Sequence, residues 1–254
     1  MILPPNAFKR RLLAGESQVG LWCTLPGGFA AEAVAGAGFD WLLFDTEHSP
    51  SDPIGVLAQL QAAAPYPVAT LVRPAWNDAV LIKRFLDAGA QTLLVPFVQT
   101  AEEAEAAVRA MRYPPRGVRG VSALTRATRF GRVPDYGRRA EEELCCLVQV
   151  ETGDALGRIE EIAGVDGVDG IFVGPADLAA SMGLIGQGGH PEVVAAVEGA
   201  IGRIVSAGKP AGVLTVDPDF ARRCMALGTT FTGVGVDAGL LARGADALAR
   251  SFKG

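Results

Sequence analysis

Short apolar runs alternate with amphipathic segments along the whole chain. The apolar runs carry few polar residues, as in Trp41-Leu42-Leu43-Phe44, which is typical of parallel strands buried on both faces. Between them, apolar residues recur at three- and four-residue spacings, as from Val80 to Ala88, which indicates helices. The pattern predicts eight strands, at Val19–Leu25, Trp41–Glu47, Val68–Arg73, Thr92–Val98, Leu144–Glu151, Gly170–Val173, Gly212–Val216 and Phe231–Val236.

The residues at the junctions favour the same alternation. Side chains that accept hydrogen bonds from a first helical turn stand where helices are predicted to begin: Asp52, Asp78, Thr100 and Asp217. Glycines, which adopt the left-handed conformation that closes a helix, stand where helices are predicted to end: Gly38, Gly89, Gly208 and Gly228. Eight strand–helix units in 254 residues predict an α/β fold, a closed (β/α)8 TIM barrel that spans residues 1–254 as a single domain. A short N-terminal helix is expected near Phe8–Leu13.

One connection is longer than the others, from Met111 to Glu143. This segment is rich in arginine (residues 112–139), and its three prolines limit helix. A connection of this length is typical of a functional loop or an interface, with a solvated basic loop as the alternative.

Composition narrows the function classes. Half of the chain is hydrophobic (49%), and the net charge of −5 argues against a nucleic-acid or anionic-membrane surface. The N-terminus lacks the apolar core of a signal peptide, and no run of about 18 apolar residues is present, so a membrane span is not expected. The four cysteines lack CxxC spacing, which favours reduced, packed thiols in a cytoplasmic protein.

Ionisable residues gather where the predicted strands end. In a (β/α)8 barrel these carboxyl ends meet at one face, where the active site forms. Glu151 ends strand five and Asp177 follows strand six, so the two carboxylates are candidate ligands of Mg²⁺ or Mn²⁺, which prefer oxygen. The alternative is that each acid only caps the helix that follows it.

His48 and Arg73 stand at the ends of two neighbouring predicted strands. His48 is a candidate general base, because its ordinary pKa lies near neutrality, although a lone histidine is as often structural. Arg73 is a fixed cation that can bind a carboxylate or an oxyanion, unless an ion pair with Asp45 or Glu47 occupies it. The second histidine, His190, precedes Pro191 at a predicted helix start and is expected to cap that helix.

Two cofactor chemistries are not expected. None of the four lysines (Lys9, Lys83, Lys209 and Lys253) ends a predicted strand, so a Schiff-base mechanism and pyridoxal phosphate are not expected. Gly233-Val-Gly235 lacks the third glycine of a dinucleotide fingerprint, so NAD is not expected either.

Six segments together resemble the HpcH/HpaI aldolase family, the metal-dependent class II pyruvate aldolases, from about residue 8 to residue 250. They are Ala35–Leu43, Asp45–His48, Val72–Asp78, Leu94–Val98, Val150–Thr152 and Gly174–Leu178. The resemblance implies reversible retro-aldol cleavage of a 4-hydroxy-2-oxo acid to pyruvate and an aldehyde, as in the catabolism of aromatic compounds. It also implies a homohexamer built as a trimer of dimers.

The resemblance also implies roles for individual residues. Glu151 and Asp177 would bind the divalent cation (Mg²⁺, Mn²⁺ or Co²⁺), Arg73 would stabilise the enolate charge, and His48 would accept the 4-hydroxyl proton. Asp87 would raise the basicity of His48. Contacts with the substrate would come from Gln149, the backbone amides of Ala176 and Asp177, and Leu214 at the aldehyde end.

Two departures from the family pattern leave the aldehyde open. The segment Arg119–Ser122 is one glycine shorter than the family pattern, and Cys23–Gly28 replaces a turn that is richer in serine. Two other functions remain as alternatives: a citrate-lyase-type acyl-CoA lyase whose arginine-rich segment holds a CoA phosphate, and a non-catalytic barrel that binds a small acid.

Overall fold

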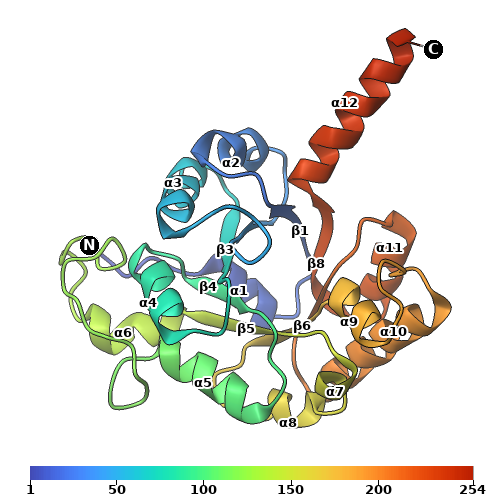
Figure 1. Cartoon of the computed structure of the whole chain (residues 1–254). Coiled ribbons are helices and arrows are strands. Elements are labelled where there is room, and N and C mark those ends of the chain that lie inside the picture. The colour runs from blue at the N-terminus through green and yellow to red at the C-terminus, as the bar shows by residue number, and fades with distance from the viewer. Residues whose placement is uncertain (254) are drawn as a thin grey trace.

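Eight parallel strands close into a barrel in chain order in the computed structural model, which describes residues 1–253 (Figure 1). The strands are β1 (Gln18–Cys23), β2 (Trp41–Asp45), β3 (Ala69–Arg73), β4 (Thr92–Val95), β5 (Cys145–Val150), β6 (Gly170–Val173), β7 (Ala211–Leu214) and β8 (Thr229–Val236). The helices are α1 (Ala7–Leu13), α2 (Gly28–Ala35), α3 (Pro53–Ala63), α4 (Ala79–Asp87), α5 (Ala101–Met111), α6 (Tyr136–Glu143), α7 (Gly153–Leu156), α8 (Ile159–Ala163), α9 (Pro175–Ser181), α10 (Pro191–Ser206), α11 (Pro218–Ala226) and α12 (Asp237–Lys253). The predicted (β/α)8 barrel and its leading helix are confirmed.

The predicted strands are all present, but several end earlier than predicted. β2 ends at Asp45, and the N–H of Glu47 then donates to the Asp45 side chain (3.0 Å) rather than to a neighbouring strand. β5 ends at Val150, one residue before Glu151. The apolar pattern runs past these ends because the first loop residues are still packed at the mouth of the barrel.

The helix boundaries follow the predicted caps. Asp52, Asp78 and Asp217 each accept a hydrogen bond from a first-turn N–H, and Thr100 accepts one from Glu103. The predicted closing glycines all have positive φ angles: Gly38, Gly89, Gly208 and Gly228. His190 caps α10 through Nδ1, as predicted.

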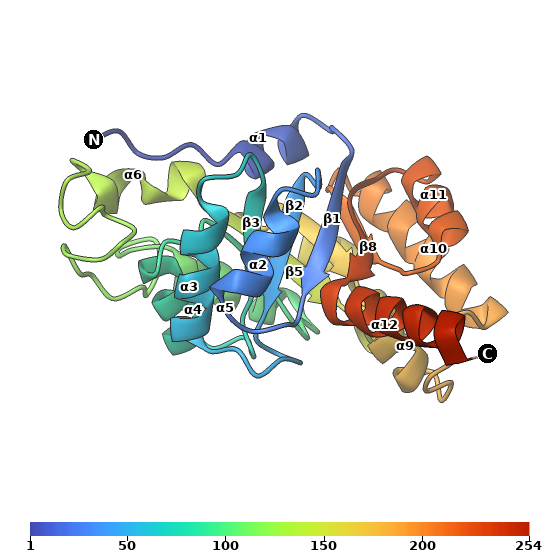
Figure 2. The ribbon, with the colours of Figure 1, turned by 90° about the horizontal axis from the view of Figure 1, so that it is seen from above.

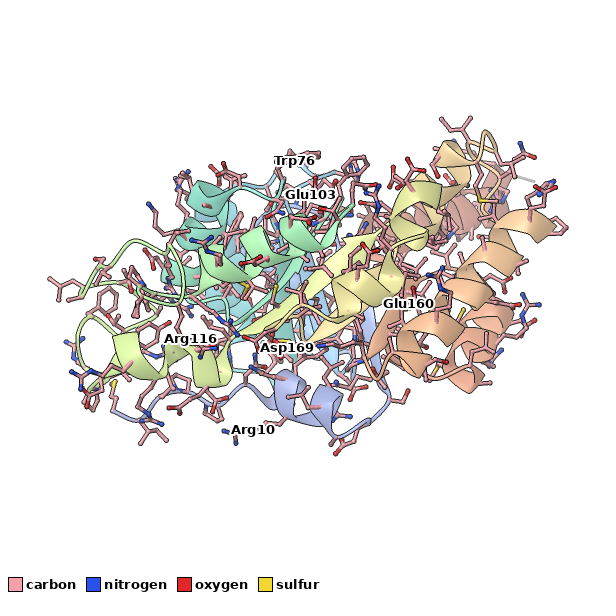
Figure 3. The ribbon with its side chains drawn as sticks, turned by 90° about the horizontal axis from the view of Figure 1, so that it is seen from below. Arg10, Trp76, Glu103, Arg116, Glu160 and Asp169 are labelled. Atoms are coloured by element: carbon pink, nitrogen blue, oxygen red, sulfur yellow. The ribbon has the colours of Figure 1, made fainter. Side chains whose placement is uncertain are left out.

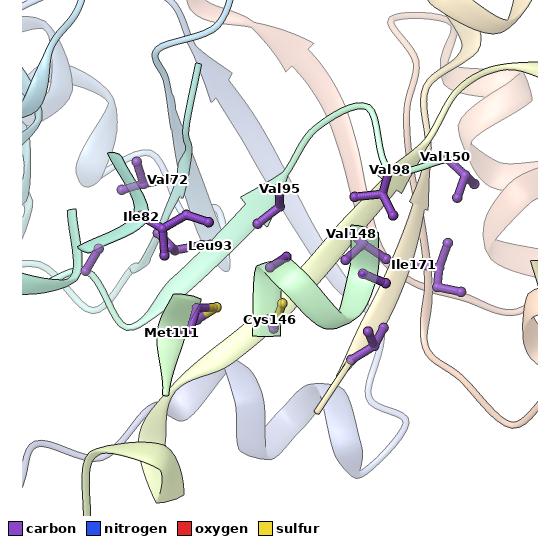
Figure 4. Packing of buried hydrophobic residues seen from close by; sticks show 14 of the residues in the cluster. Val72, Ile82, Leu93, Val95, Val98, Met111, Cys146, Val148, Val150 and Ile171 are labelled. Carbon is purple, nitrogen blue, oxygen red and sulfur yellow. The ribbon is translucent and has the colours of Figure 1, made fainter. Parts of the chain in front are cut away.

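Two apolar layers hold the barrel. One fills its interior and includes Trp41, Leu147 and Phe172; the other lies between the strands and the surrounding helices, where Figure 4 shows Ile82 beside Leu93. Cys145 belongs to the inner layer and Cys146 to the outer one, as expected for neighbours on a strand. All four cysteines are free and buried, as predicted.

The ends of the barrel differ in what covers them. Helix α1 lies at the end where the strands begin, which leaves the opposite, carboxyl end open for the loops that carry the candidate residues (Figure 2). Helix α12 projects away from the barrel (Figure 1), and its residues from Leu240 onward are exposed. Within residues 1–253 no helix is long and apolar enough to cross a membrane.

The long connection between α5 and β5 contains α6 and several ion pairs. Arg112 and Arg116 form ion pairs with Glu141 of α6 and with Asp166, which follows α8, so part of the arginine-rich segment is neutralised by these carboxylates. Arg119 is fully buried, and the interpretation of the whole segment as a solvated basic loop is therefore wrong for this residue.

Candidate active site

A buried ion-pair network lies at the carboxyl ends of β2 and β3. Arg73 donates from Nε and Nη2 to the two oxygens of Asp45, both at 2.8 Å, and its Nη1 lies 2.8 Å from a Glu47 oxygen. The guanidinium also lies over the ring of Trp22, 4.8 Å from its centroid. The contact with Glu47 lacks hydrogen-bond geometry, so Arg73 donates two of its five N–H groups to Asp45 and keeps three for other acceptors.

Arg73 therefore forms ion pairs with both Asp45 and Glu47, the two partners that the sequence analysis named as alternatives to a bound anion. Burial alone would raise the pKa of Asp45, but the hydrogen bonds and charge of Arg73 outweigh it and lower the pKa. Burial raises the pKa of Glu47 despite the opposing charges of Arg73 and His48. Asp45 thus anchors the guanidinium firmly, whereas Glu47 is the weaker of its two partners.

His48 lies at the edge of this network. Its side chain is 63% exposed, and its Nε2 lies 3.9 Å from Glu47. Because Glu47 also contacts Arg73, this carboxylate bridges the candidate base and the candidate oxyanion binder. The structure thus brings His48 and Arg73 together, as the neighbouring strand ends predicted.

Glu151, directly after β5, is held on both oxygens. The backbone N–H of Phe97 donates to Oε1 (2.9 Å), and Gln149 Nε2 donates to Oε2. The residue is 1% exposed. Burial, and repulsion from Asp177 and Glu47, raise the pKa of Glu151 to about 7 although both hydrogen bonds oppose the shift.

Asp177 lies in the first turn of α9 and is exposed. Its side chain and that of Glu151 form no ion pair among residues 1–253, and the alternative that these acids cap their helices is wrong. Helix α7 is capped by Thr152, which accepts from the N–H of Ala155 (3.1 Å), and the N-cap position of α9 is Gly174, which has no side chain. Their charges are therefore free for another partner.

Gly174 makes room for this arrangement. A Cβ on Gly174 would lie 2.5 Å from Glu151 Oε2 and 3.0 Å from Gln149 Nε2. Its φ of −96° is open to any residue, so close approach rather than backbone conformation requires glycine here. The chain between β6 and α9 thus passes directly against the Glu151 carboxylate.

The structure does not bring Asp87 to His48 within one chain. Asp87 ends α4, a helix that returns toward the amino ends of the strands, and its carboxylate accepts a hydrogen bond from Arg119 (2.7 Å). The Arg119 guanidinium is also stacked on Tyr113, 4.5 Å from the ring centroid. Within this chain the Asp87 carboxylate therefore pairs with Arg119, and the role toward His48 that the resemblance implies stays a prediction.

The predicted substrate residues line the same open end. Gln149 is buried, and its Oε1 has no hydrogen-bond partner among residues 1–253, so it can accept from a ligand. A cavity of about 660 Å³ is lined by residues that include Ala176, Leu214 and Phe220. Leu214 also packs against the inner layer of the barrel.

Other residues at this end of the barrel were named in the sequence analysis only as ion-pair alternatives or not at all. Asp45 and Glu47 stand in the Asp-Thr-Glu-His run, which signals chemistry without showing which of them binds Arg73. The N–H of Phe97 carries no sequence signal, because a backbone donor looks the same at every residue except proline. Asp237, at the end of β8, is structural: it accepts hydrogen bonds from Thr24 and Leu25.

Carboxylate, imidazole and guanidinium side chains lie at the carboxyl ends of this closed (β/α)8 barrel. The active sites of (β/α)8-barrel enzymes form at that end, so the fold and the site are those of such an enzyme. The profile of the HpcH/HpaI aldolase/citrate lyase family matches residues 18–244. The chain belongs to this family and is a carbon–carbon lyase.

Similar proteins cover nearly the whole chain. A pyruvate aldolase of Rhizobium etli is 71% identical over 252 residues, which are 99% of each chain. A 4-hydroxy-2-oxo-heptane-1,7-dioate aldolase of Klebsiella pneumoniae is 58% identical over 97% of this chain and 94% of its own. A crystal structure of a family member from Burkholderia cenocepacia superposes with a TM-score of 0.94 at 39% identity, covering 98% of this chain and 100% of that one.

Proposed function

We propose that this protein is a divalent-metal-dependent aldolase that reversibly cleaves a 4-hydroxy-2-oxo acid to pyruvate and an aldehyde. Substrates of this class include 4-hydroxy-2-oxoheptanedioate and related 2-keto-3-deoxy sugar acids. The observation that carries the proposal is the site itself: two carboxylates without an ion-pair partner among residues 1–253, Glu151 and Asp177, lie at the same barrel end as Arg73 and His48. The aldolase names of the similar proteins support it.

The donor set fits a divalent cation. Burial is the largest cause of the raised pKa of Glu151, and repulsion from Asp177 and Glu47 adds to it, so a cation beside the carboxylate would offset an unfavourable charge. Carboxylate oxygens suit Mg²⁺ and Mn²⁺. A bound cation supplies a Lewis acid that polarises the keto-acid carbonyl and stabilises the enolate charge.

Arg73 and His48 supply the remaining steps from the protein. N–H groups of Arg73 that do not donate to Asp45 donate to the developing enolate oxygen, and Asp45 fixes the guanidinium in place for this contact. His48 accepts the 4-hydroxyl proton as the carbon–carbon bond breaks, and Glu47, on its Nε2 side, stabilises the protonated ring. Electrons from that bond pass to the keto acid, which leaves as pyruvate after it takes up a proton.

Substrate orientation comes from the residues around Glu151 and Asp177. Gln149 and the amides of Ala176 and Asp177 bind the keto acid, and Leu214 contacts the aldehyde part. The cavity beside Ala176 and Leu214 supports this assignment, because its wall is largely apolar and leaves space for a chain of several carbons.

A coupled assay of pyruvate release tests the proposal. Chelation with EDTA is expected to abolish cleavage, and Mg²⁺, Mn²⁺ or Co²⁺ to restore it. Glu151→Gln should lose cation binding, whereas Asp154→Asn, three residues away on α7, should behave as the wild type. A covalent adduct after borohydride treatment with pyruvate, or full activity in EDTA, would refute the metal-dependent mechanism.

We also infer assembly into a homohexamer built as a trimer of dimers. Helix α12 projects from the barrel and exposes Leu241, Leu248 and Phe252, and burying this apolar surface against a second copy would stabilise a dimer. A monomeric mass by light scattering would contradict this inference. Deletion of residues 240–253 is expected to dissociate the assembly.

A further inference from the structure

Phe97 has a backbone conformation that its side chain disfavours. Its φ is +54°, in the left-handed region that bulky residues rarely enter. The other non-glycine residues with positive φ, Arg129, Phe130 and Asp135, lie in the segment between α5 and α6. Strained residues of this kind persist only where their surroundings hold them, and they gather at functional sites.

This conformation points the N–H of Phe97 at the site. The chain leaves β4 at Val95, and Val98 is already buried again, with its N–H donating to the carbonyl of Gln149 (3.0 Å). Phe97 turns the backbone between these two points, and its N–H donates to Glu151 Oε1 (2.9 Å). An extended residue at this position would direct the N–H elsewhere, because φ sets the orientation of the amide relative to the following chain.

The ring of Phe97 is held by a neighbour from another strand end. It stacks on Trp76, with ring centroids 5.4 Å apart and planes at 29°. Both rings remain partly exposed, so the pair stands at the surface rather than in the core. Figure 3 places Trp76 at the end of the molecule opposite Arg10 of α1, which is the end that carries the candidate active site.

We propose that Phe97 is a positioning residue for cation binding: its left-handed backbone, held by the Trp76 stack, orients the carboxylate of Glu151. With Phe97 N–H on Oε1 and Gln149 on Oε2, the carboxylate cannot rotate, and each oxygen keeps a lone pair for a cation. The inference rests on the proposed function, since it assumes that Glu151 is a ligand. Loss of a group that orients a metal ligand typically weakens affinity by about 10- to 100-fold.

Mn²⁺ binding to the enzyme without substrate, followed by electron paramagnetic resonance of the free ion, tests the proposal. Phe97→Val should raise the Kd by about tenfold or more, because a β-branched residue resists positive φ. Phe97→Gly should bind within about threefold of the wild type, because glycine adopts this φ freely. Thermal unfolding shows whether each variant is folded; if Phe97→Val does not fold, Phe97→Ala should bind more weakly than Phe97→Gly.

Trp76→Ala tests the contribution of the aromatic stack independently of Phe97 itself. It should weaken Mn²⁺ binding in the wild-type background and have no further effect in Phe97→Gly, which has no ring to stack. Equal losses in Phe97→Val and Phe97→Gly, an unchanged Kd in Phe97→Val, or equal effects of Trp76→Ala in both backgrounds would overturn the proposal. Unchanged Mn²⁺ binding in Glu151→Gln would instead refute the cation site of the proposed function.

Discussion

Gly174→Ala tests whether the close packing around Glu151 matters to the chemistry. The added methyl group would lie 2.5 Å from Glu151 Oε2, 2.9 Å from its Cβ and 3.0 Å from Gln149 Nε2. These contacts are too short to persist, so the carboxylate, its amide partner or the loop must move. Because the φ of residue 174 suits alanine, any effect is due to these contacts and not to backbone strain.

The magnitudes separate stability from cation binding. Overpacking costs about 1–3 kcal/mol, while replacing glycine at an allowed φ returns about 0.4–1 kcal/mol through the unfolded chain. We therefore expect the free energy of unfolding to fall by between about 0 and about 2.6 kcal/mol. A displaced carboxylate should weaken Mn²⁺ binding by about 10- to 100-fold, or about 1.4–2.7 kcal/mol.

Three measurements check this expectation: urea unfolding, Mn²⁺ titration, and pyruvate release at several Mn²⁺ concentrations. Gly199→Ala in α10 is the matched control, because its added Cβ meets no atom within 4 Å. It should bind Mn²⁺ as the wild type does and gain up to about 1 kcal/mol of stability. Wild-type Mn²⁺ affinity in Gly174→Ala would refute the reasoning, since Glu151 would then not depend on its packing.

Three further predictions concern the charged groups. Arg73→Lys loses the two-point contact with Asp45 and should lower kcat by about 10²–10³-fold at saturating Mn²⁺. The Kd for Mn²⁺ should change little, and an unchanged kcat would contradict the role of Arg73. Because the pKa of Asp45 is lowered in the folded protein, Asp45 contributes stability above its unfolded pKa of about 3.9, and this contribution is lost as pH falls toward the lower folded pKa. In urea unfolding at several pH values, Asp45→Asn should reduce the fall of the unfolding free energy at acid pH. Asp87→Asn leaves buried Arg119 without its ionic partner and should lower the free energy of unfolding by about 2–4 kcal/mol. A shift in the pH profile of kcat in the same variant would show that Asp87 also acts on His48.

Local sequence signals predicted the elements well and their ends less well. Capping residues such as Asp52 and Asp78 act on N–H groups two or three residues away, so their effect is visible in the sequence. Strand ends depend on partners from distant segments. For this reason Glu47 and Glu151 were predicted as strand residues but lie just beyond the strands.

In the candidate site, too, the sequence predicted the positions of residues, and the structure was needed to identify their partners. Positions of Arg73, Glu151 and Asp177 at strand ends followed from the alternation, because parallel strands bring their carboxyl ends to one face. The capping alternatives for Glu151 and Asp177 were decided only by the structure, which shows Thr152 and Gly174 in those places. Asp87 carried no local signal at all: its role toward His48 comes from the resemblance alone and stays a prediction, and only the structure shows that it pairs with Arg119 in this chain.

The sequence by itself determined the barrel, the open end that carries the chemistry, and the types of residue found there. Periodicity and capping act over a few residues, so they need no knowledge of the fold. Only the tertiary structure decided which groups pair: Asp45 with Arg73 across 28 positions, and the N–H of Phe97 with Glu151 across 54. Hydrogen bonds need donor and acceptor within about 3 Å, and closure of the barrel is what brings these distant groups so close.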